Sequence, residues 1–473
     1  MNFVSWSFVA LFTVVVLARL TIGRRKIEPG YVAVLLVAST VFYAWHIPIY
    51  IGILLFSSVV DYWAALWLAR IPAASLRQRR VVLALSLATN LGLLAFFKYG
   101  NFLVQAAGDL LGASAVAALP PEFVVALPMG ISFYTFQSMS YTIDVYRGIL
   151  TPIRHFLPFF LFISFFPQLV AGPIVRAVEF LPQMPRPRRL RLRVFYEGAW
   201  LIVCGFFLKM VCADNLAVYV DEHWPRGSDA ETTSGFALWL ALMFSGQIFA
   251  DFAGYSNIAR GTAYILGYHL PLNFNAPYLA ASFKNFWERW HMTLSRWLRD
   301  YLYVPLGGNR RGPVRTYINL LLVMVLGGLW HGAAYTYIAW GALHGGALAI
   351  ERLVGLHRTS GWGANAVARL AWFAVVQGVV LTAWVFFRSR TIEEAGRFAG
   401  NIVAMDDWSL GGMEKIGLLF LLPIVGLHAF AWLRERGLAG ELGPTAKAVL
   451  AAGMVYAIVT LYAGTADFIY FQF

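Results

Sequence analysis

The chain has 473 residues, 59% hydrophobic and only 13% charged, with a mean hydropathy of +0.65 and a net charge of 37 − 24 = +13. Soluble domains carry about 25% charged residues, so this composition excludes an ordinary soluble protein. The positive charge gathers in a few short loops, which the positive-inside rule explains better than nucleic-acid binding does. Those loops are 70–80, 186–193, 284–315 and 434–436.

Apolar runs close to the roughly 20 residues that cross a bilayer recur from end to end of the chain. Examples are 31–47, 48–69, 316–330, 366–387 and 445–463. The runs are continuous rather than alternating with a period of two, which excludes a transmembrane β-barrel. The sequence therefore predicts an all-α polytopic membrane protein.

The first apolar segment, Phe3 to Ile22, is followed rather than preceded by positive charge, at Arg24, Arg25 and Lys26. A cleaved signal peptide has its charge first and a small-residue cleavage site after the apolar stretch. We therefore predict a retained first span whose amino end lies outside the cytoplasm.

Acidic loops at 221–231 and 393–407 alternate with the basic ones and fit the outer face. This alternation predicts roughly 11 or 12 crossings with both termini outside. The segment 122–166 fits a single crossing with a re-entrant piece. Cys204 and Cys212 lie inside an apolar span, so neither a disulfide framework nor a cysteine metal site is expected. We predict one integral domain over residues 1–473.

Ionisable groups inside membrane spans cost about 2.5–3.5 kcal/mol on insertion scales, which makes them functional candidates. In the segment 245–261, Gln247, Asp251 and Tyr255 follow one another at i, i+4 and i+8 and share a helix face. Asp251 needs a partner in this apolar setting, such as a histidine or an arginine of another helix. An orienting role fits Asp251 better than direct chemistry.

The stretch 285–312 combines tryptophans, arginines and a histidine. On one continuous helix, Glu288, His291, Ser295 and Arg299 form a single polar stripe. Because tryptophan and tyrosine favour the headgroup level, we predict a helix at the inner interface. An ordinary amphipathic surface helix accounts for the arginines, but it does not account for a histidine among tryptophans.

The sequence PLGGNRRG at 305–312 predicts a turn after this helix. The exposed amides of such a turn can hold phosphates, together with the side chains of Arg299, Asn309, Arg310 and Arg311. The basic loops also serve as topology signals, which is the alternative explanation of the same residues.

His331 and His344 lie in the glycine-rich segment 327–346. A neutral imidazole can take a proton at working pH and return it, because its ordinary pKa is near 6.5. A structural histidine that bonds to a carbonyl of a neighbouring helix is the alternative for His331, and it is the favoured reading for His344. Zinc-type spacings, a Walker A loop and a G-x-S-x-G elbow are all absent from the sequence, so no metal site is predicted.

These motifs together resemble the membrane-bound O-acyltransferase family and, within it, the bacterial alginate O-acetyltransferase branch. The stretches that carry the resemblance are LPMGISFYTFQSMSYTIDVYRG at 127–148, FPQLVAGPIVR at 166–176, DFAGYSNIARG at 251–261, the stretch 273–312, GGLWHGA at 327–333 and FIYFQF at 468–473. The resemblance implies a fold of about 11–12 transmembrane helices, with re-entrant and interfacial helices, around a central tunnel.

The resemblance also implies the chemistry. His331 matches the catalytic histidine of the family, and His291 matches its second functional position. His331 is then expected to deprotonate a hydroxyl, while His291 or Trp330 steadies the oxyanion. Glu288, Ser295, Asp251 and Tyr255 are expected to support them. Ala253 and Asn257 stand where the branch often has Ser and Asp, so that second acidic position has no assigned role here.

Acetyl-CoA is the implied donor, as a substrate from the cytoplasm rather than a bound cofactor. An exported polysaccharide and a periplasmic acetyltransferase protein are the implied partners, besides membrane lipids, in the inner membrane of a bacterium. FIYFQF at 468–473 is expected to dock that protein, to line the exit or to anchor the interface. The alternatives are a proton-coupled transporter, a polyprenyl-linked glycosyltransferase and, within the family, acylation of peptidoglycan, cellulose or teichoic acid.

Overall fold

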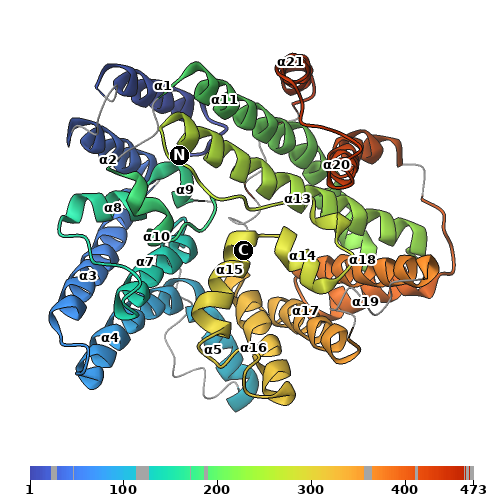
Figure 1. Cartoon of the computed structure of the whole chain (residues 1–473). Coiled ribbons are helices and arrows are strands. Elements are labelled where there is room, and N and C mark those ends of the chain that lie inside the picture. The colour runs from blue at the N-terminus through green and yellow to red at the C-terminus, as the bar shows by residue number, and fades with distance from the viewer. Residues whose placement is uncertain are drawn as a thin grey trace. The chain divides into compact units, whose positions relative to one another are not determined.

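The computed structural model describes most of the chain. The residues that it does not describe are 23–28, 46, 113–126, 171, 186–189, 356–364, 411–413, 463, 465–467 and 469–473. The described residues form helices joined by loops, without a strand among them, which confirms the predicted all-α class (Figure 1). The basic triplet at 24–26, half of the loop at 186–193 and the last five residues of FIYFQF lie outside the described part.

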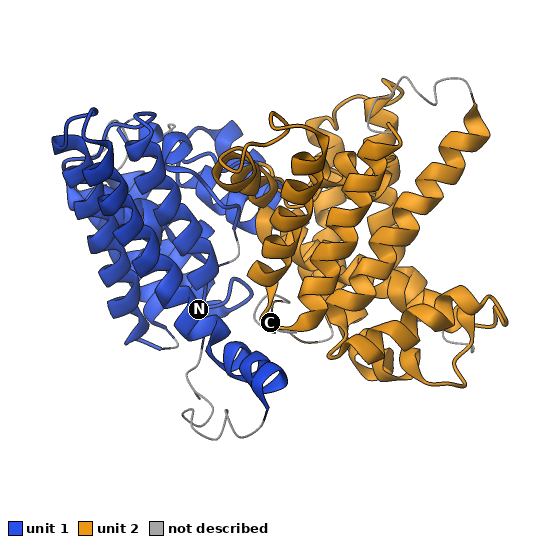
Figure 2. Cartoon of the chain, turned by 90° about the horizontal axis from the view of Figure 1, so that it is seen from below, with its two compact units in different colours: residues 1–202, 258–271 blue, residues 203–257, 272–473 orange. Residues whose placement is uncertain are grey.

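The chain divides into two compact units, shown in Figure 2. Unit 1 contains residues 1–202 and 258–271, and unit 2 contains residues 203–257 and 272–473. The chain passes from one unit to the other inside two helices, α11 (Leu192–Phe206) and α13 (Ser234–Ile265), and again just after α13.

Among the described residues, unit 1 has nine α-helices besides its share of α11 and α13. They are α1 (Trp6–Thr21), α2 (Pro29–Ala44), α3 (Tyr50–Arg70), α4 (Leu76–Leu94), α5 (Gly100–Leu111), α7 (Ile131–Tyr146), α8 (Phe156–Ser164), α9 (Phe166–Leu169) and α10 (Ala177–Phe180). The segment 122–166 contains the two short helices α7 and α8, neither of which has the length of a full crossing. The reason is its composition, since α7 carries polar residues along its length and is buried from Ile131 to Val145.

A polar cluster ties α3, α4 and α7 together inside unit 1. Its centre is the carboxylate of Asp61, which has no exposed surface. Ser86 and Asn90 of α4 and Ser138 and Thr142 of α7 all donate hydrogen bonds to it. Because each carboxylate oxygen accepts more than one bond, the cost of burying Asp61 is offset by its neighbours.

Unit 2 contains the remaining helices. They are α12 (Asp214–His223), α14 (Phe283–Arg289), α15 (Met292–Leu298), α16 (Pro313–His331), α17 (Tyr335–Leu353), α18 (Ala366–Arg388), α19 (Ile392–Ala404), α20 (Glu414–Glu435) and α21 (Pro444–Thr460). Helices α16, α17 and α18 pack one on the next. Glycines permit the closest of these contacts: a Cβ atom at Gly328 would overlap the Tyr337 carbonyl, and one at Gly341 would overlap the Met324 carbonyl.

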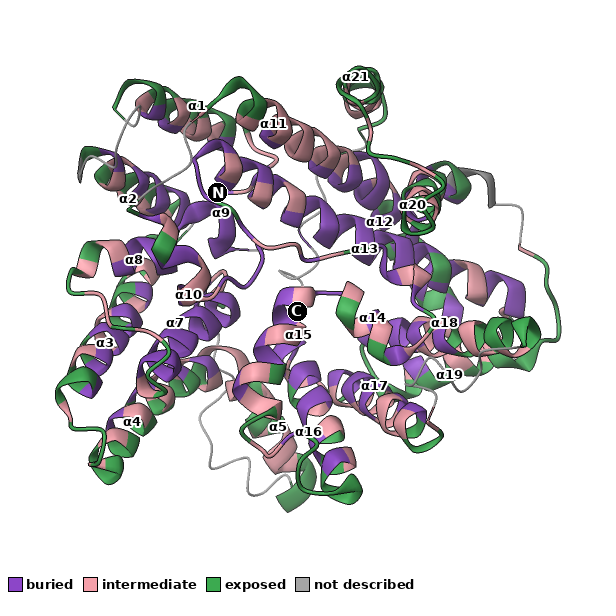
Figure 3. Cartoon of the chain, viewed as in Figure 1, coloured by how far each residue is buried: buried purple, intermediate pink, exposed green. Residues whose placement is uncertain are grey.

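Seven helical segments of the described chain are long and apolar enough to cross a membrane, and three shorter apolar helices accompany them. The seven are Tyr50–Arg70, Leu76–Leu111, Leu192–Ser228, Ser234–Ile265, Pro313–His331, Ala366–Arg388 and Gly417–Glu435. Helix α21 has no buried residue, and Figure 3 colours its residues as exposed and intermediate. Such an apolar exposed surface fits contact with lipid, while the number of crossings and their direction stay predictions.

Candidate functional site

Two histidines that stand forty residues apart in the sequence come together in unit 2. His331 is the last residue of α16, and His291 lies at the break between α14 and α15. The centroids of the two imidazole rings are 6.4 Å apart. Both side chains are buried, at 3% and 0% exposure. The structure therefore pairs the two histidines to which the sequence assigned chemistry.

The chain breaks its helix at His291. Trp290 is extended, and His291 has a φ of 40°, in the left-handed region. The prediction of one continuous helix was therefore wrong. A left-handed conformation costs a residue other than glycine about 1–3 kcal/mol, and strain of this kind gathers at functional sites. Here His291 caps the next helix, because the Leu294 amide donates a hydrogen bond to Nδ1 at 3.4 Å.

Asn273, which the sequence analysis did not single out, holds this break in place. Its backbone carbonyl accepts a bond from the Met292 amide at 2.9 Å, and its side-chain oxygen accepts bonds from Thr293 Oγ1 at 2.9 Å and from the Thr293 amide at 3.3 Å. Asn273 Oδ1 also lies 3.2 Å from His291 Nδ1. The Asn273 amide donates to Ser256 Oγ, which ties the break to α13. No spacing rule in the sequence links position 273 to position 291.

Aromatic rings enclose His331. The rings of Trp330 and Trp340 lie 5.0 Å from it, and that of Phe387 lies 5.4 Å from it. We call His331, Trp330, Trp340 and Phe387, together with His291, the ring chamber. Trp330, expected to act beside His331, also contacts His291 at 5.9 Å. Within this apolar surrounding, burial lowers the pKa of His291 to about 3, so its imidazole is neutral near pH 7.

One face of α17 contacts both α16, which ends at His331, and α14, which ends just before His291. Trp340 contacts His331 on α16, and His344, one turn further, stacks on Phe286 of α14 at 5.8 Å. Glu351 then accepts hydrogen bonds from the amides that begin α14, those of Phe283 and Lys284. The glycine-rich approach of α16 and α17 therefore fixes the position of α14 as well.

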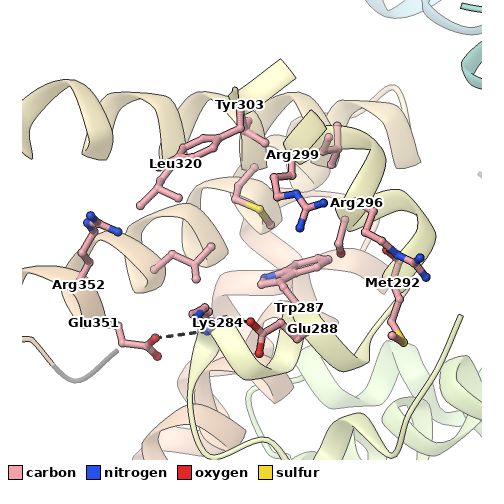
Figure 4. A pocket seen from close by; sticks show the side chains of 15 residues that line it. Lys284, Trp287, Glu288, Met292, Arg296, Arg299, Tyr303, Leu320, Glu351 and Arg352 are labelled. Atoms are coloured by element: carbon pink, nitrogen blue, oxygen red, sulfur yellow. Dashed lines mark hydrogen bonds and ion pairs between the residues drawn. The ribbon is translucent and has the colours of Figure 1, made fainter. Parts of the chain in front are cut away.

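A pocket of about 710 Å³ opens beside this face (Figure 4). Glu288, Ser295 and Arg299 of the predicted polar stripe all line it. The fourth member, His291, is not among the lining residues, because the break at Trp290 turns it into the ring chamber. In Figure 4 the indole of Trp287 lies between Arg299 and the pair of Lys284 and Glu288.

The pocket is lined by apolar side chains and by charged ones of both signs. The basic members are Lys284, Arg296, Arg299 and Arg352, and the acidic members are Glu288 and Glu351. The charge of the lining is therefore 4 − 2 = +2. Lys284 and Glu288 pair at 3.5 Å, and Arg299 pairs with Asp300 at 2.7 Å. An anionic ligand with an apolar arm matches this lining.

The other predicted ligand-binding residues lie elsewhere. Asn309, Arg310 and Arg311 are exposed in the predicted turn and do not line the pocket. The turn itself is fixed by Asn319 of α16, whose amide donates to the Gly308 carbonyl at 2.9 Å. Arg299 is thus the one member of this predicted set that the structure places in the pocket.

Asp251 has a different partner from the one that we expected. Lys209, in the π-helical turn Phe207–Ala213, lies 2.7 Å from Asp251 and 2.7 Å from Asp214. The prediction of a histidine or an arginine was therefore wrong. From this turn the Lys209 ammonium reaches both acids. Tyr255 lies beside the same group, with its ring 5.7 Å from the Lys209 ammonium.

The described residues contain no group of three or more His, Cys, Asp or Glu side chains placed to hold a metal ion. Cys204 and Cys212 are free thiols rather than a disulfide. The side chains of the ring chamber itself are imidazole, indole and phenyl groups.

The chain is similar to known proteins over the region that contains both histidines. Residues 152–383, which include both histidines, match the model of the membrane-bound O-acyltransferase family. The chain is 40% identical over 408 residues to the probable alginate O-acetylase AlgI of Pseudomonas syringae pv. tomato, covering 85% of this chain and 76% of that protein.

Two further relatives act on other polymers. The chain is 37% identical over 416 residues to the peptidoglycan O-acetyltransferase of Helicobacter pylori, covering 82% of this chain and 76% of the relative. It is 31% identical over 239 residues to the teichoic acid D-alanyltransferase of Bacillus subtilis, covering 48% of this chain and 58% of the relative.

Proposed function

Because the chain belongs to the membrane-bound O-acyltransferase family and is therefore an O-acyltransferase, we propose that it transfers an acetyl group from acetyl-CoA to a hydroxyl, for acetylation of an exported polysaccharide. The observation that carries the proposal is the ring chamber, which holds a buried pair of histidines next to a cationic pocket. The proton-coupled transporter considered from the sequence is set aside by the family assignment.

His331 is the proposed general base. A hydroxyl is a weak nucleophile near neutral pH, and a neutral imidazole can take its proton as the oxygen attacks the thioester carbon. The tetrahedral intermediate then collapses, the carbon–sulfur bond breaks, and the leaving thiolate takes the proton from His331. General-base catalysis of this kind contributes about 10²–10⁴-fold to the rate.

His291 is the proposed oxyanion donor. Thr293 already supplies two donors to Asn273 Oδ1, which fills the two lone pairs of that oxygen. His291 Nδ1 then accepts from the Leu294 amide, and the ring proton stands on Nε2. A neutral N–H group in a water-poor chamber can stabilise the negative charge that develops on the thioester oxygen. The left-handed backbone at His291 gives the ring its direction toward this chamber.

The pocket is the proposed donor site. Its basic side chains, above all Arg296, Arg299 and Arg352, can attract the phosphates of acetyl-CoA, and its apolar wall can hold the arm of the donor. Our sequence-based topology places the pocket at the cytoplasmic side, where this donor is made. The turn at 305–312 can attract the donor before it enters.

The proposed acceptor is a polysaccharide outside the cytoplasm. The relatives named for alginate and for peptidoglycan acetylation support a glycan acceptor, and an alginate-like polymer is our first choice. Peptidoglycan, cellulose and teichoic acid are the alternatives within the family. A periplasmic acetyltransferase is proposed to finish the transfer, at a bacterial inner membrane in which both termini face outward.

The test is transfer of labelled acetyl from acetyl-CoA by the purified protein in liposomes, with soluble oligosaccharide acceptors outside. We expect His331→Gln to lose about 10²–10⁴-fold in rate while its melting temperature stays that of the wild type. His428→Gln is the matched control, because His428 is also buried but bonds to the Ile424 carbonyl of its own helix. Equal rates for the wild type and His331→Gln contradict the assigned base.

A further inference from the structure

A buried lysine joins two acids in unit 2, and the reaction proposed above does not use it. Lys209 is 1% exposed, and its ammonium lies 2.7 Å from Asp214 of α12 and 2.7 Å from Asp251 of α13. It stands in the π-helical turn Phe207–Ala213. Such turns are rare and occur frequently at functional sites. Burying charged groups is costly even when they are paired, which makes this cluster a candidate for a specific role.

The π-helical turn lies directly against α13. A Cβ atom at Gly254 would lie 2.8 Å from the Gly205 carbonyl oxygen and 3.0 Å from the Lys209 amide nitrogen. Glycine at this position permits the two backbones to approach so closely. The contact lies within one turn of Asp251, so the backbone contact and the ion pair act on the same part of α13. Together they resist both rotation and sliding of this helix.

The same part of α13 supports His291. Phe252 is the residue next to the ion-paired acid, and its ring centroid lies 4.7 Å from that of the His291 imidazole, with 86° between the ring planes. Ser256, one turn further along α13, accepts a hydrogen bond from the Asn273 amide at 3.2 Å. Asn273 in turn holds the break in the helix at His291. Two supports of His291 therefore rest on the part of α13 that Lys209 fixes.

We propose that Lys209 is a positioning residue for His291. It acts through α13, because its ion pair to Asp251 fixes the ring of Phe252 beside the imidazole. This inference rests on the proposed function, in which His291 Nε2 donates to the thioester oxyanion. Oxyanion donors act within about 2.7–3.1 Å of that oxygen, and a displacement of about 1 Å can cost about 10²-fold in rate. The second acid, Asp214, anchors the lysine to α12.

The two acids of the cluster provide a matched pair of variants. Asp251→Asn removes the acid on α13, which also carries Phe252, whereas Asp214→Asn removes the acid on α12. In each variant Lys209 keeps one acid, so the buried ammonium is not left unpaired. A purely structural cluster predicts that both variants lose stability and that neither changes the rate per folded molecule. A positioning role predicts that only Asp251→Asn changes that rate.

The measurement is the labelled-acetyl assay in liposomes, with rates given per folded molecule. We expect Asp251→Asn to lower kcat about tenfold, with KM for acetyl-CoA changed less than about twofold, because the pocket is left intact. Asp214→Asn should change neither constant by more than about twofold. Phe252→Leu should lower kcat as Asp251→Asn does. The double variant Asp251→Asn/Phe252→Leu should lose no more than the more affected single variant, because both changes act by one route.

Equal values of kcat in Asp251→Asn and Asp214→Asn overturn the proposal, and so does a double variant whose losses multiply. If Asp251→Asn does not fold, the pair Asp251→Glu and Asp214→Glu decides, because each keeps the charge and lengthens one bridge by a methylene group. The same difference in kcat is then expected, and its absence overturns the proposal. A wild type that transfers no acetyl overturns the proposed function instead.

Discussion

The Asp61 cluster of unit 1 and the ring chamber of unit 2 are both polar groups buried in an apolar protein, yet they are built in opposite ways. Around Asp61, four side chains of two neighbouring helices donate to one carboxylate. Around His331, the rings of Trp330, Trp340 and Phe387 lie with their centroids 5.0–5.4 Å from the imidazole.

This difference separates two uses of a buried polar residue. A carboxylate whose oxygens are all occupied has no bond left to offer a substrate, so it serves to hold helices together. An imidazole has an ordinary pKa near 6.5 and can both take and return a proton, so a histidine surrounded by rings is a candidate for chemistry. Asp251 is likewise paired inside the protein, since the Lys209 ammonium lies 2.7 Å from it.

The distinction between a structural Asp61 cluster and a reactive ring chamber fails if Asp61 takes part in the reaction. Asp61→Ala should remove the acceptor of four donors, and hydrogen bonds between membrane helices average about 0.6 kcal/mol, so we expect a loss of about 2–3 kcal/mol in the free energy of unfolding. The rate per folded molecule should stay that of the wild type. Unfolding in a detergent titration and acetyl transfer by the surviving folded fraction measure the two quantities.

Asp61→Asn is the matched control for this change, because the amide keeps the size of the side chain and one acceptor oxygen. It should lose less stability than Asp61→Ala. A rate per folded molecule that drops with either variant would place Asp61 in the reaction and remove the distinction drawn here.

The sequence was sufficient for the features that depend on local pattern. Continuous apolar runs predicted the all-α membrane class, which the structure confirms. The candidates His291, His331 and Trp330 also came from the sequence, and the structure brings all three together. These features follow from composition, from helix geometry and from motifs that lie in one stretch.

The features that the sequence could not provide depend on contacts between distant stretches. Helical spacing placed His291 in a stripe with Glu288, but Asn273 and the His291 side chain replace the helix bonds at that point. Nothing in the spacing of positions 209 and 251 indicated that Lys209 would reach Asp251. Tertiary hydrogen bonds overrode local periodicity in one case, and tertiary ion pairing chose the partner in the other.

The variant Asn273→Ala tests whether Asn273 holds His291 in its position in the ring chamber. Losing the amide should free His291 from its left-handed position, so we expect a fall of about tenfold in kcat, which is about 1.4 kcal/mol, with KM for acetyl-CoA unchanged. Asn273→Asp, which keeps the acceptor oxygen for Thr293, should recover part of the rate. Full activity in Asn273→Ala would show that the break at His291 does not depend on this clamp.

The smallest expected effect concerns the pH dependence of stability. The pKa of His291 is lowered to about 3 in the folded protein, so between that value and its ordinary 6.5 the unfolded chain binds more protons than the folded one. Stability therefore falls as the pH drops, and from about pH 7.5 to about pH 6 the contribution of His291 is a loss of about 0.8 kcal/mol. His291→Asn should lose less stability than the wild type over the same interval, in melting temperatures measured in one detergent. Parallel curves for the two proteins would mean that His291 can become charged in the folded state, and the ring chamber would then be open to water.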